Sequence, residues 1–253
     1  MKFYDQMAQT YDYFIDWPER IKKEDPFYQH LFQECLGKSI LDLGCSTGGH
    51  ALYWGEMGYN VVGIDSSSKM IKYAQELAEK EEVDIEFQCM KITDFASRFQ
   101  QKFDAVICAG NTLSHLLDKP SIIRLFTESI AVMKITSVAI YHLLNYRLIL
   151  ENRRRDFPVK SRIVEGTEYV FARFYDFQTE HLEFNMVSAV KDENGWHSRS
   201  SQLLHHPWLA DELIEMAKEA GFTEIMTYGD YDFSEFDPET SQDLLLVCEL
   251  GEA

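Results

Sequence analysis

A glycine-rich turn and an acidic residue that follows it carry the clearest chemistry in the sequence. The apolar segment Ser39–Leu43 runs directly into residues 44–49, whose sequence is Gly-Cys-Ser-Thr-Gly-Gly. Glycines let the chain turn tightly and let a ligand approach bare backbone. Asp65 closes the next apolar segment, 65 − 42 = 23 residues after Asp42. A carboxylate in that place can accept hydrogen bonds from both hydroxyls of a ribose, so the pair predicts a site for an adenosine-type cofactor.

Other nucleotide sites and metal sites fit these residues less well. A dinucleotide site needs Gly-x-Gly-x-x-Gly, and Ser46 stands where the second glycine would touch the pyrophosphate. A P-loop needs Gly-Lys-Ser/Thr after the turn, which the sequence lacks. No cysteines form a Cys-x-x-Cys pair, and the adjacent His205 and His206 do not have the spacing that places two ligands on one helix face. We therefore expect no metal site.

The elements that must position these residues alternate between strands and helices. Apolar segments predict strands at residues 39–43, 60–65, 84–88, 103–108 and 138–142, and helical patterns predict helices at 50–57, 69–81 and 122–133. Two more helices are expected at 4–15 and 26–36, where Pro26 suits a first turn and Gly37 a C-terminal cap. Such alternation is typical of an α/β fold, in which a parallel sheet carries helices on both faces.

The alternation breaks after Tyr146. Long β-prone runs follow at 167–177, 180–190 and 196–204, and Asn194-Gly195 is a strong hairpin signal. The chain then returns to a helix at 209–220 and to strands at 224–228 and 243–249. The expected domains are an N-terminal helical lid (1–36), a cofactor-binding domain (37–146 and 205–253) and an inserted antiparallel β cap (147–204).

Several segments together resemble the class I S-adenosylmethionine-dependent methyltransferases. They are residues 40–49, 61–65, 66–73 and 103–116, the pair Asn145-Tyr146 and the helix after Pro207, so the likeness covers most of the chain. In the segment 103–116, Gly110-Asn111 is followed by a hydroxyl residue and then by His115, which is similar to the small-molecule branch around glycine N-methyltransferase. The resemblance implies a Rossmann-like, seven-stranded methyltransferase sheet. It also implies S-adenosyl-L-methionine as cofactor and S-adenosyl-L-homocysteine as product.

The resemblance further implies which residues contact the cofactor. Asp65 would hold the ribose, Gly44 would face the methionine moiety, and Ser66 and Met70 would sit beside the adenine. The whole expected set is Tyr11, Arg20, Asp42, Gly44, Cys45, Ser46, Asp65, Ser66, Met70, Lys91, Ile92, Ala109 and Asn111. Within this set, Lys91 and Ile92 would edge the adenine ring, and Tyr11 and Arg20 would close over the carboxylate.

Methyl transfer from a sulfonium asks the protein mainly to align three atoms, the acceptor lone pair, the methyl carbon and the sulfur. A general base is needed only if the acceptor arrives protonated. His115 and His142 are the candidates for that base, with Tyr146 and Tyr175 as orienting hydroxyls. The resemblance places Asn111 near the sulfonium and the acceptor, and Asn111, His115, His142 and Tyr146 form the expected catalytic set.

The acceptor side departs from the glycine-methylating relatives. In those relatives an arginine directly before the Asn-Tyr pair clamps the substrate carboxylate, and here that position is Leu144. Glycine is therefore expected to be a poor substrate. The run Arg153–Arg155 is the one cationic cluster of the sequence, and it is either a solvated loop or an anchor for a carboxylate or phosphate on the acceptor.

Composition limits the remaining function classes. The 253 residues carry a formal charge of −18, which argues against nucleic-acid and membrane partners. Five scattered cysteines and a polar, aromatic start are typical of a reduced cytoplasmic protein. We expect a methyltransferase acting on N, O or S of a small molecule by in-line displacement. A protein or RNA methyltransferase and a non-catalytic cofactor-binding module remain open, as does a homo-oligomeric state.

Overall fold

The computed structural model describes residues 2–35 and 37–251, and its larger part is a seven-stranded sheet. The strands are β1 (Ser39–Leu43), β2 (Asn60–Asp65), β3 (Glu86–Cys89), β4 (Phe103–Cys108), β5 (Met133–Leu144), β10 (Glu224–Tyr228) and β11 (Asp243–Glu249). Their order is β10-β11-β5-β4-β1-β2-β3, and β1 to β5 run parallel. The predicted Rossmann-like sheet is confirmed, and β11 adds a strand antiparallel to both its neighbours.

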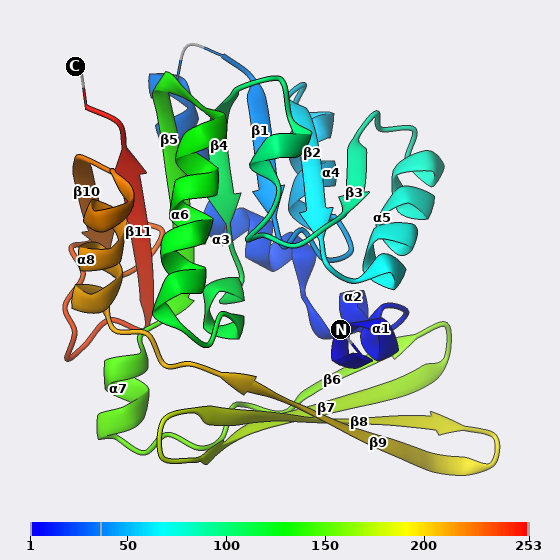
Figure 1. Cartoon of the computed structure of the whole chain (residues 1–253). Helices are drawn as coiled ribbons and strands as arrows, with labels where there is room; N and C mark the ends of the chain where they lie inside the picture. Colours follow the sequence, from blue (N-terminus) through cyan, green and yellow to red (C-terminus); the bar gives the residue numbers. More distant parts are fainter. Residues whose placement is uncertain (1, 36, 252–253) are drawn as a thin grey trace.

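Helices cover both faces of this sheet (Figure 1). On one face lie α6 (Lys119–Val132) and α8 (Ala210–Ala220), and on the other α3 (Trp17–Glu34), α4 (Gly49–Glu56) and α5 (Ser68–Lys80). Successive strand residues point to opposite faces. In β1, Leu41 and Leu43 therefore pack in the first core and Ile40 in the second, all of them buried.

A second, four-stranded antiparallel sheet forms the predicted cap. Its strands are β6 (Lys160–Val164), β7 (Thr167–Phe177), β8 (Leu182–Asp192) and β9 (Gly195–His205), in that order. Figure 1 shows this sheet facing the carboxyl ends of the parallel strands, with α1 (Lys2–Met7) and α2 (Tyr11–Phe14) between the two. Phe3, Met7 and Phe14 pack against Phe171 and Met186 of the cap. The N-terminal segment therefore closes one side of the space between the sheets.

The N-terminal helices differ from the prediction. The predicted start at Pro26 is wrong, because α3 begins at Trp17 and Pro26 lies inside it. A proline inside a helix removes one backbone hydrogen bond, and the complete burial of the adjacent Phe27 and Tyr28 offsets that loss. The predicted helix at 4–15 is two short helices with a turn at residues 8–10. Residue 36 at the predicted end of the second helix, and residues 1, 252 and 253, lie outside the described residues.

One strand and one α-helix were not predicted from the strand and helix patterns. They are β6 and α7 (Tyr146–Glu151), whose first turn is capped by Asn145. The Asn145 side chain accepts a hydrogen bond from the backbone N–H of Leu148 at 3.5 Å. Helix α7 thus begins directly after β5 and leads the chain into the cap.

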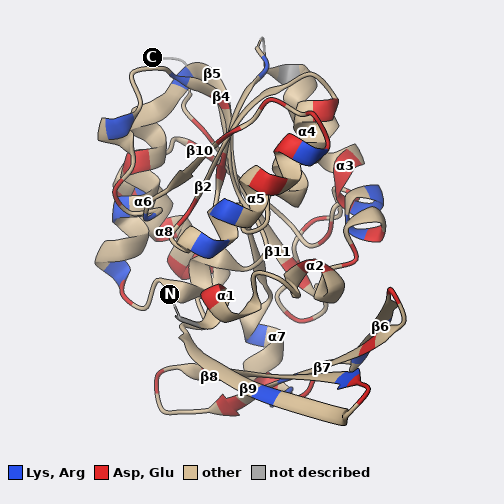
Figure 2. Ribbon diagram, turned by 90° about the vertical axis from the view of Figure 1, so that its right-hand side faces the viewer, with Lys and Arg blue, Asp and Glu red and all other residues tan. Residues whose placement is uncertain are grey.

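None of the described helices has the length and apolar character needed to cross a lipid bilayer. Figure 2 shows that charged residues of both signs lie on the outward sides of α3 and α5. The acid excess of the sequence is thus interspersed with basic residues on these surfaces.

Candidate active site

Two adjoining cavities lie between the seven-stranded sheet and the cap. The first, of about 500 Å³, is lined by residues that follow β1, β2, β3 and β4. The second, of about 480 Å³, is lined by the N-terminal helices, the end of β5 and the cap strands β7 and β8. Both are lined by Tyr4, Tyr11, Arg20, Gly110 and His115. Parallel strands present their carboxyl ends at one edge, which is where ligands bind in such sheets.

The glycine-rich turn brings bare backbone to the first cavity. Gly44 has a φ of +76°, and a Cβ there would lie 2.7 Å from Cγ2 of Thr112. Only glycine fits that position, both because the backbone is left-handed and because Thr112 occupies the space. Ser46 also has a positive φ, of 55°. The turn therefore lets a ligand approach the main chain closely.

The Asp65 carboxylate is oriented by two backbone N–H groups. Oδ2 accepts from Ser46 N at 3.1 Å, and Oδ1 accepts from Ser67 N at 2.8 Å. Burial raises the pKa of Asp65, and these two hydrogen bonds oppose that rise. A carboxylate oxygen has two lone pairs, so each oxygen can still accept another hydrogen bond from the cavity that Asp65 lines.

Asp42 is a buried acid at the floor of the same cavity. Its side chain is almost inaccessible, and Oδ2 has no hydrogen-bond partner among the described residues. Burial raises the pKa of Asp42 to about 7, against the lowering effect of Arg20 and with a further rise from Asp65. Arg20 is itself paired with Glu24, Nε to Oε1, at 2.8 Å. The orphaned Asp42 oxygen is therefore available to a cationic or hydrogen-bond-donating group of a ligand.

We expect the Asp42→Asn variant to gain stability over wild-type protein as the pH rises. In the folded protein the pKa of Asp42 is about 7, above the ordinary value of 3.8. The protonated carboxyl therefore makes its full contribution to the free energy of unfolding below a pH of about 4. This contribution is lost as the pH rises through about 7, and the amide does not titrate. Thermal unfolding without cofactor should show a Tm difference that grows over this window. A difference that stays constant would contradict the raised pKa.

Most other residues predicted to bind the cofactor line the first cavity. They are Tyr11, Arg20, Cys45, Ser46, Ser66, Lys91, Ile92 and Ala109. Met70 is not among the described residues that line it. Its side chain is fully buried in the cluster of Phe3 and Phe14, and its Sδ lies 3.8 Å from the Ser46 hydroxyl. The structure therefore does not support a contact between Met70 and an adenine, because this side of the α5 first turn packs on the N-terminal helices.

Asn111 lines the second cavity, and internal contacts occupy its amide. Nδ2 donates to the Tyr146 hydroxyl at 2.8 Å and to the Ser114 hydroxyl at 3.1 Å, and Oδ1 accepts from Leu144 N at 3.1 Å. Its φ of +68° suits an asparagine at a tight turn. The geometry thus makes Asn111 a positioning residue that joins the ends of β4 and β5.

Tyr146 lies behind the wall of the second cavity, outside its described lining. It is 1% exposed, and its hydroxyl is also 3.4 Å from that of Tyr175 and 3.3 Å from His205 Nδ1. Tyr175 and His205 themselves line the cavity. The Tyr146 hydroxyl is therefore connected to the cavity through the side chains of Tyr175 and His205.

His115 stands where the two cavities meet. Its Nε2 is 2.8 Å from the hydroxyl of Tyr4, a residue whose importance the sequence patterns did not indicate. Burial lowers the pKa of His115 to about 4, and the pKa of the neighbouring His205 is also lowered, mainly by burial. Both imidazoles are therefore neutral at neutral pH. A group with a pKa of about 4 is a weak base, so His115 is suited to positioning and hydrogen bonding.

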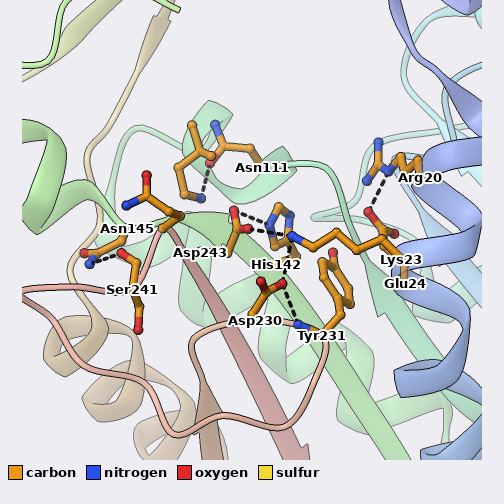
Figure 3. Close-up of polar contacts among 12 residues, drawn as sticks. Arg20, Lys23, Glu24, Asn111, His142, Asn145, Asp230, Tyr231, Ser241 and Asp243 are labelled. Carbon is orange, nitrogen blue, oxygen red and sulfur yellow. Dashed lines mark hydrogen bonds and ion pairs between the residues drawn. The ribbon is translucent and has the colours of Figure 1, made fainter.

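His142, at the end of β5, is held by an acid from the neighbouring strand. Its Nε2 is 3.1 Å from Asp243 Oδ1, and Lys23 lies 3.7 Å from the other oxygen of Asp243 and 2.7 Å from Asp230 (Figure 3). The carboxylate favours the proton on Nε2, which leaves a lone pair on Nδ1. That nitrogen is buried and has no partner among the described residues. Because His142 lines the second cavity, its arrangement fits a proton acceptor.

The arginine run lies outside both cavities. Arg153 packs over the Phe177 ring, and Arg155 packs over Phe174 and pairs with Asp176 at 2.8 Å. Arg154 donates to Gln242 at 2.9 Å. None of the three is among the described residues that line a cavity. The geometry therefore favours the interpretation of Arg153–Arg155 as a solvated loop over their interpretation as an anchor for the acceptor.

Sequence patterns missed several residues of the cavities. Tyr4 and Trp17 belong to the N-terminal helices, Asp243 to β11, and Lys160 and Arg173 to the cap. These residues are far from the motifs in the sequence, and only the packing of the N-terminal helices, β11 and the cap brings them there. The one usable signal was Arg173, a charged residue in a strand of otherwise apolar inward positions.

Comparison with known proteins shows which proteins this chain resembles in sequence and in fold. Residues 40–135 match the family model described as a methyltransferase domain. The chain is 27% identical over 239 residues to the glycine/sarcosine N-methyltransferase of Aphanothece halophytica, covering 91% of this chain and 83% of that one. Its fold is similar to that of the CcbJ methyltransferase from Streptomyces caelestis, with a TM-score of 0.77, 20% identity and coverage of 99% and 98%. The sugar N-methyltransferase KedS8 from Streptoalloteichus sp. also shares the fold, with a TM-score of 0.72, 18% identity and coverage of 91% and 87%.

The family match spans β1 to the start of β5, which includes the glycine-rich turn, Asp65 and the Gly110-Asn111 segment. These elements supply most of the lining of the first cavity, and the N-terminal helices supply the rest. With its methyltransferase domain, its N-methyltransferase relatives and this cavity, the chain is a class I S-adenosylmethionine-dependent methyltransferase.

Proposed function

We propose that this enzyme transfers a methyl group to a nitrogen, oxygen or sulfur atom of a small-molecule acceptor by in-line displacement. The observation that carries the proposal is the pair of cavities that meet at Gly110 and His115. A cofactor in the first cavity and an acceptor in the second would face each other at that junction. The glycine/sarcosine N-methyltransferase relatives named above support a small acceptor.

The residues of the first cavity fit S-adenosyl-L-methionine. The cofactor supplies an electrophilic methyl group on a sulfonium sulfur. Asp65 has acceptor capacity for the ribose hydroxyls, and the orphaned oxygen of Asp42 suits an ammonium group. Gly44 leaves the main chain bare beside both acids. These residues would bind and orient the cofactor, so the chain's contribution in the first cavity is to align the methyl group for transfer.

In this proposal His142 is the general base for an acceptor that arrives protonated. Nδ1 takes the proton, and Asp243 stabilises the imidazolium that forms, as a carboxylate does for a catalytic histidine. The acceptor lone pair then forms the new bond to the methyl carbon while the carbon–sulfur bond breaks. His115, with its pKa of about 4, serves as a positioning residue beside Tyr4.

We also propose the domain division given by the sequence, with residues 1–36 as lid, 147–204 as cap, and 37–146 with 205–253 as the cofactor-binding domain. Tyr4 and Tyr11 of the N-terminal helices line both cavities, and Phe14 packs on the cap. A lid of this kind excludes water from the reacting atoms and encloses a small acceptor. This enclosure favours a small molecule over a protein or RNA substrate.

We expect turnover with at least one amine, hydroxyl or thiol metabolite and little with glycine. Leu144 lines the second cavity and cannot clamp a carboxylate directly beside the reacting atom. The measurement is a panel of metabolites followed by coupled detection of S-adenosylhomocysteine, with heat-denatured enzyme as the blank. Robust sarcosine formation would contradict the Leu144 argument. Absence of turnover with every acceptor, while the cofactor still binds, would favour a non-catalytic binding module.

A further inference from the structure

Arg173 is a charged residue on the inward face of the cap. Side chains alternate along β7, so Phe171, Arg173 and Tyr175 share one face, and Arg173 lies opposite Met186 of β8. Phe171, Tyr175 and Met186 are buried, and Arg173, Tyr175 and Met186 line the second cavity. A guanidinium in an apolar row of this kind is costly unless something compensates its charge.

No carboxylate among the described residues pairs with Arg173. Its Nε is buried without a hydrogen-bond partner in that part of the chain, and burial is the main cause that lowers its pKa. The guanidinium carbon lies 4.7 Å from the centre of the Phe14 ring and 4.9 Å from that of Phe157. Two rings hold the planar group in place, but they supply no acceptor for its buried Nε–H.

Two other cations of the second cavity, Arg20 and Lys23, are already paired with carboxylates. Arg20 contacts Glu24 at 2.8 Å, and Lys23 contacts Asp230 at 2.7 Å and Asp243 at 3.7 Å. At the rim, Asp16 is engaged by Arg162 at 2.8 Å. The acids that line the cavity near these positions are therefore not available to Arg173.

Lys160 is a second cation at the same end of the cavity. Its Nζ donates to the backbone oxygen of Phe14 at 3.2 Å and lies 4.8 Å from the centre of the Phe14 ring. It has no carboxylate within ion-pair distance among the described residues. Burial lowers the pKa of Lys160, and the charge of Arg173 lowers it further. Two cations thus share Phe14 in a protein whose formal charge is −18.

We propose that Arg173, assisted by Lys160, binds an oxyanion group of the methyl acceptor. The inference rests on the proposed function, since it names the acceptor class for the same site. The acceptor would carry a carboxylate or a phosphate at the cap end of the cavity, and its amine, hydroxyl or thiol would lie at the junction with the first cavity. Arginine suits both anions, because its fork donates two parallel hydrogen bonds to either.

The test uses the whole protein saturated with S-adenosylhomocysteine and titrated with paired probes by calorimetry or ligand-observed NMR. The probes are straight-chain carboxylates, their primary amides and the corresponding alkylphosphonates. We expect wild-type protein to bind either the carboxylate or the phosphonate about ten-fold or more tightly than the amide. Whichever of these two anions binds more tightly identifies the oxyanion group that the acceptor carries. Arg173→Met should lose this preference, Arg173→Lys should keep part of it, and Lys160→Met should weaken it.

Arg155→Met is the matched control, because Arg155 also stacks on an aromatic ring but lies outside the cavity. It should leave the preference unchanged, and all variants should bind S-adenosylhomocysteine as wild-type protein does. Equal binding of acids and amides, no measurable binding of any anion, or a preference that survives Arg173→Met would each overturn the proposal. If Arg173→Met unfolds, the graded effects of Arg173→Lys and Lys160→Met decide in its place.

A methyl-transfer assay run beside these binding measurements separates this inference from the proposed function. Anion preference that depends on Arg173, together with no methyl transfer to any acceptor, would contradict the transfer reaction and support the anion site. Transfer to neutral acceptors as efficient as transfer to their anionic counterparts would contradict the anion site and support the transfer reaction.

Discussion

An Asp65→Ala variant should bind S-adenosylhomocysteine at least about ten-fold more weakly than wild-type protein. Asp65 lines the first cavity, and among the described residues there it is the one acid whose two oxygens are both oriented by backbone N–H groups, from Ser46 and Ser67. Each hydrogen bond between a hydroxyl and a charged group contributes ~1.5 kcal/mol or more, which corresponds to about ten-fold in affinity. Isothermal titration calorimetry measures this directly.

Removing Asp65 also leaves the N–H groups of Ser46 and Ser67 without their partner, so a fall in Tm is expected as well. Asp84→Ala is the control, since Asp84 is an exposed acid before β3 and lies outside the described lining of the cavity. An Asp65→Ala protein that folds and binds S-adenosylhomocysteine with unchanged affinity would refute the ribose assignment.

A His142→Gln variant should lose about 10²-fold in kcat near neutral pH while its affinity for S-adenosylhomocysteine stays the same. The loss follows from the proposed role of His142 Nδ1 as proton acceptor, because general base catalysis contributes at least about this factor. With an amine acceptor the deficit should shrink at higher pH, where the amine loses its proton to solvent without help from the enzyme. The measurement is the pH profile of kcat for the variant and the wild-type enzyme, side by side.

Two further variants make this prediction specific. Asp243→Asn removes the carboxylate that lies 3.1 Å from His142 Nε2. It should therefore also lower kcat, without weakening cofactor binding. His115→Gln should not change the shape of the pH profile in the neutral range, because the pKa of His115 is about 4. A His142→Gln enzyme that keeps its kcat across the profile would rule out His142 as the base.

The lining of the first cavity could be predicted in large part from the sequence because its determinants are local. Ser39–Leu43, the turn at 44–49 and Asp65 are close in the chain, and strand ends in a parallel sheet meet at one edge. The structure accordingly places Gly44, Asp42 and Asp65 around one cavity. Met70 is the exception, because its direction depends on the N-terminal helices that pack over it.

The acceptor side could not be predicted in the same way, because it is built from distant segments. Arg153–Arg155 is the cationic run in the sequence, yet it lies outside both cavities, and Arg173 is the cap arginine that lines the second cavity. Asp243 reaches His142 only because β11 pairs antiparallel with β5. The contact between Asp243 and His142 leaves no trace in local spacing, and the only local signal for Arg173 is its place among apolar residues on one face of a strand.

By itself, the sequence determined the α/β class, the glycine-rich turn and the position of Asp65 at the end of a strand, since these depend on short-range hydrophobic alternation and on turn chemistry. Only the tertiary structure decided which of the two candidate histidines has an acid partner, which arginine of the cap lines the second cavity and that Tyr146 lies behind its wall. The physical reason is that side-chain direction and charge pairing depend on neighbours brought in by packing. His142 with Asp243 and Arg173 between Phe14 and Phe157 are contacts of that kind.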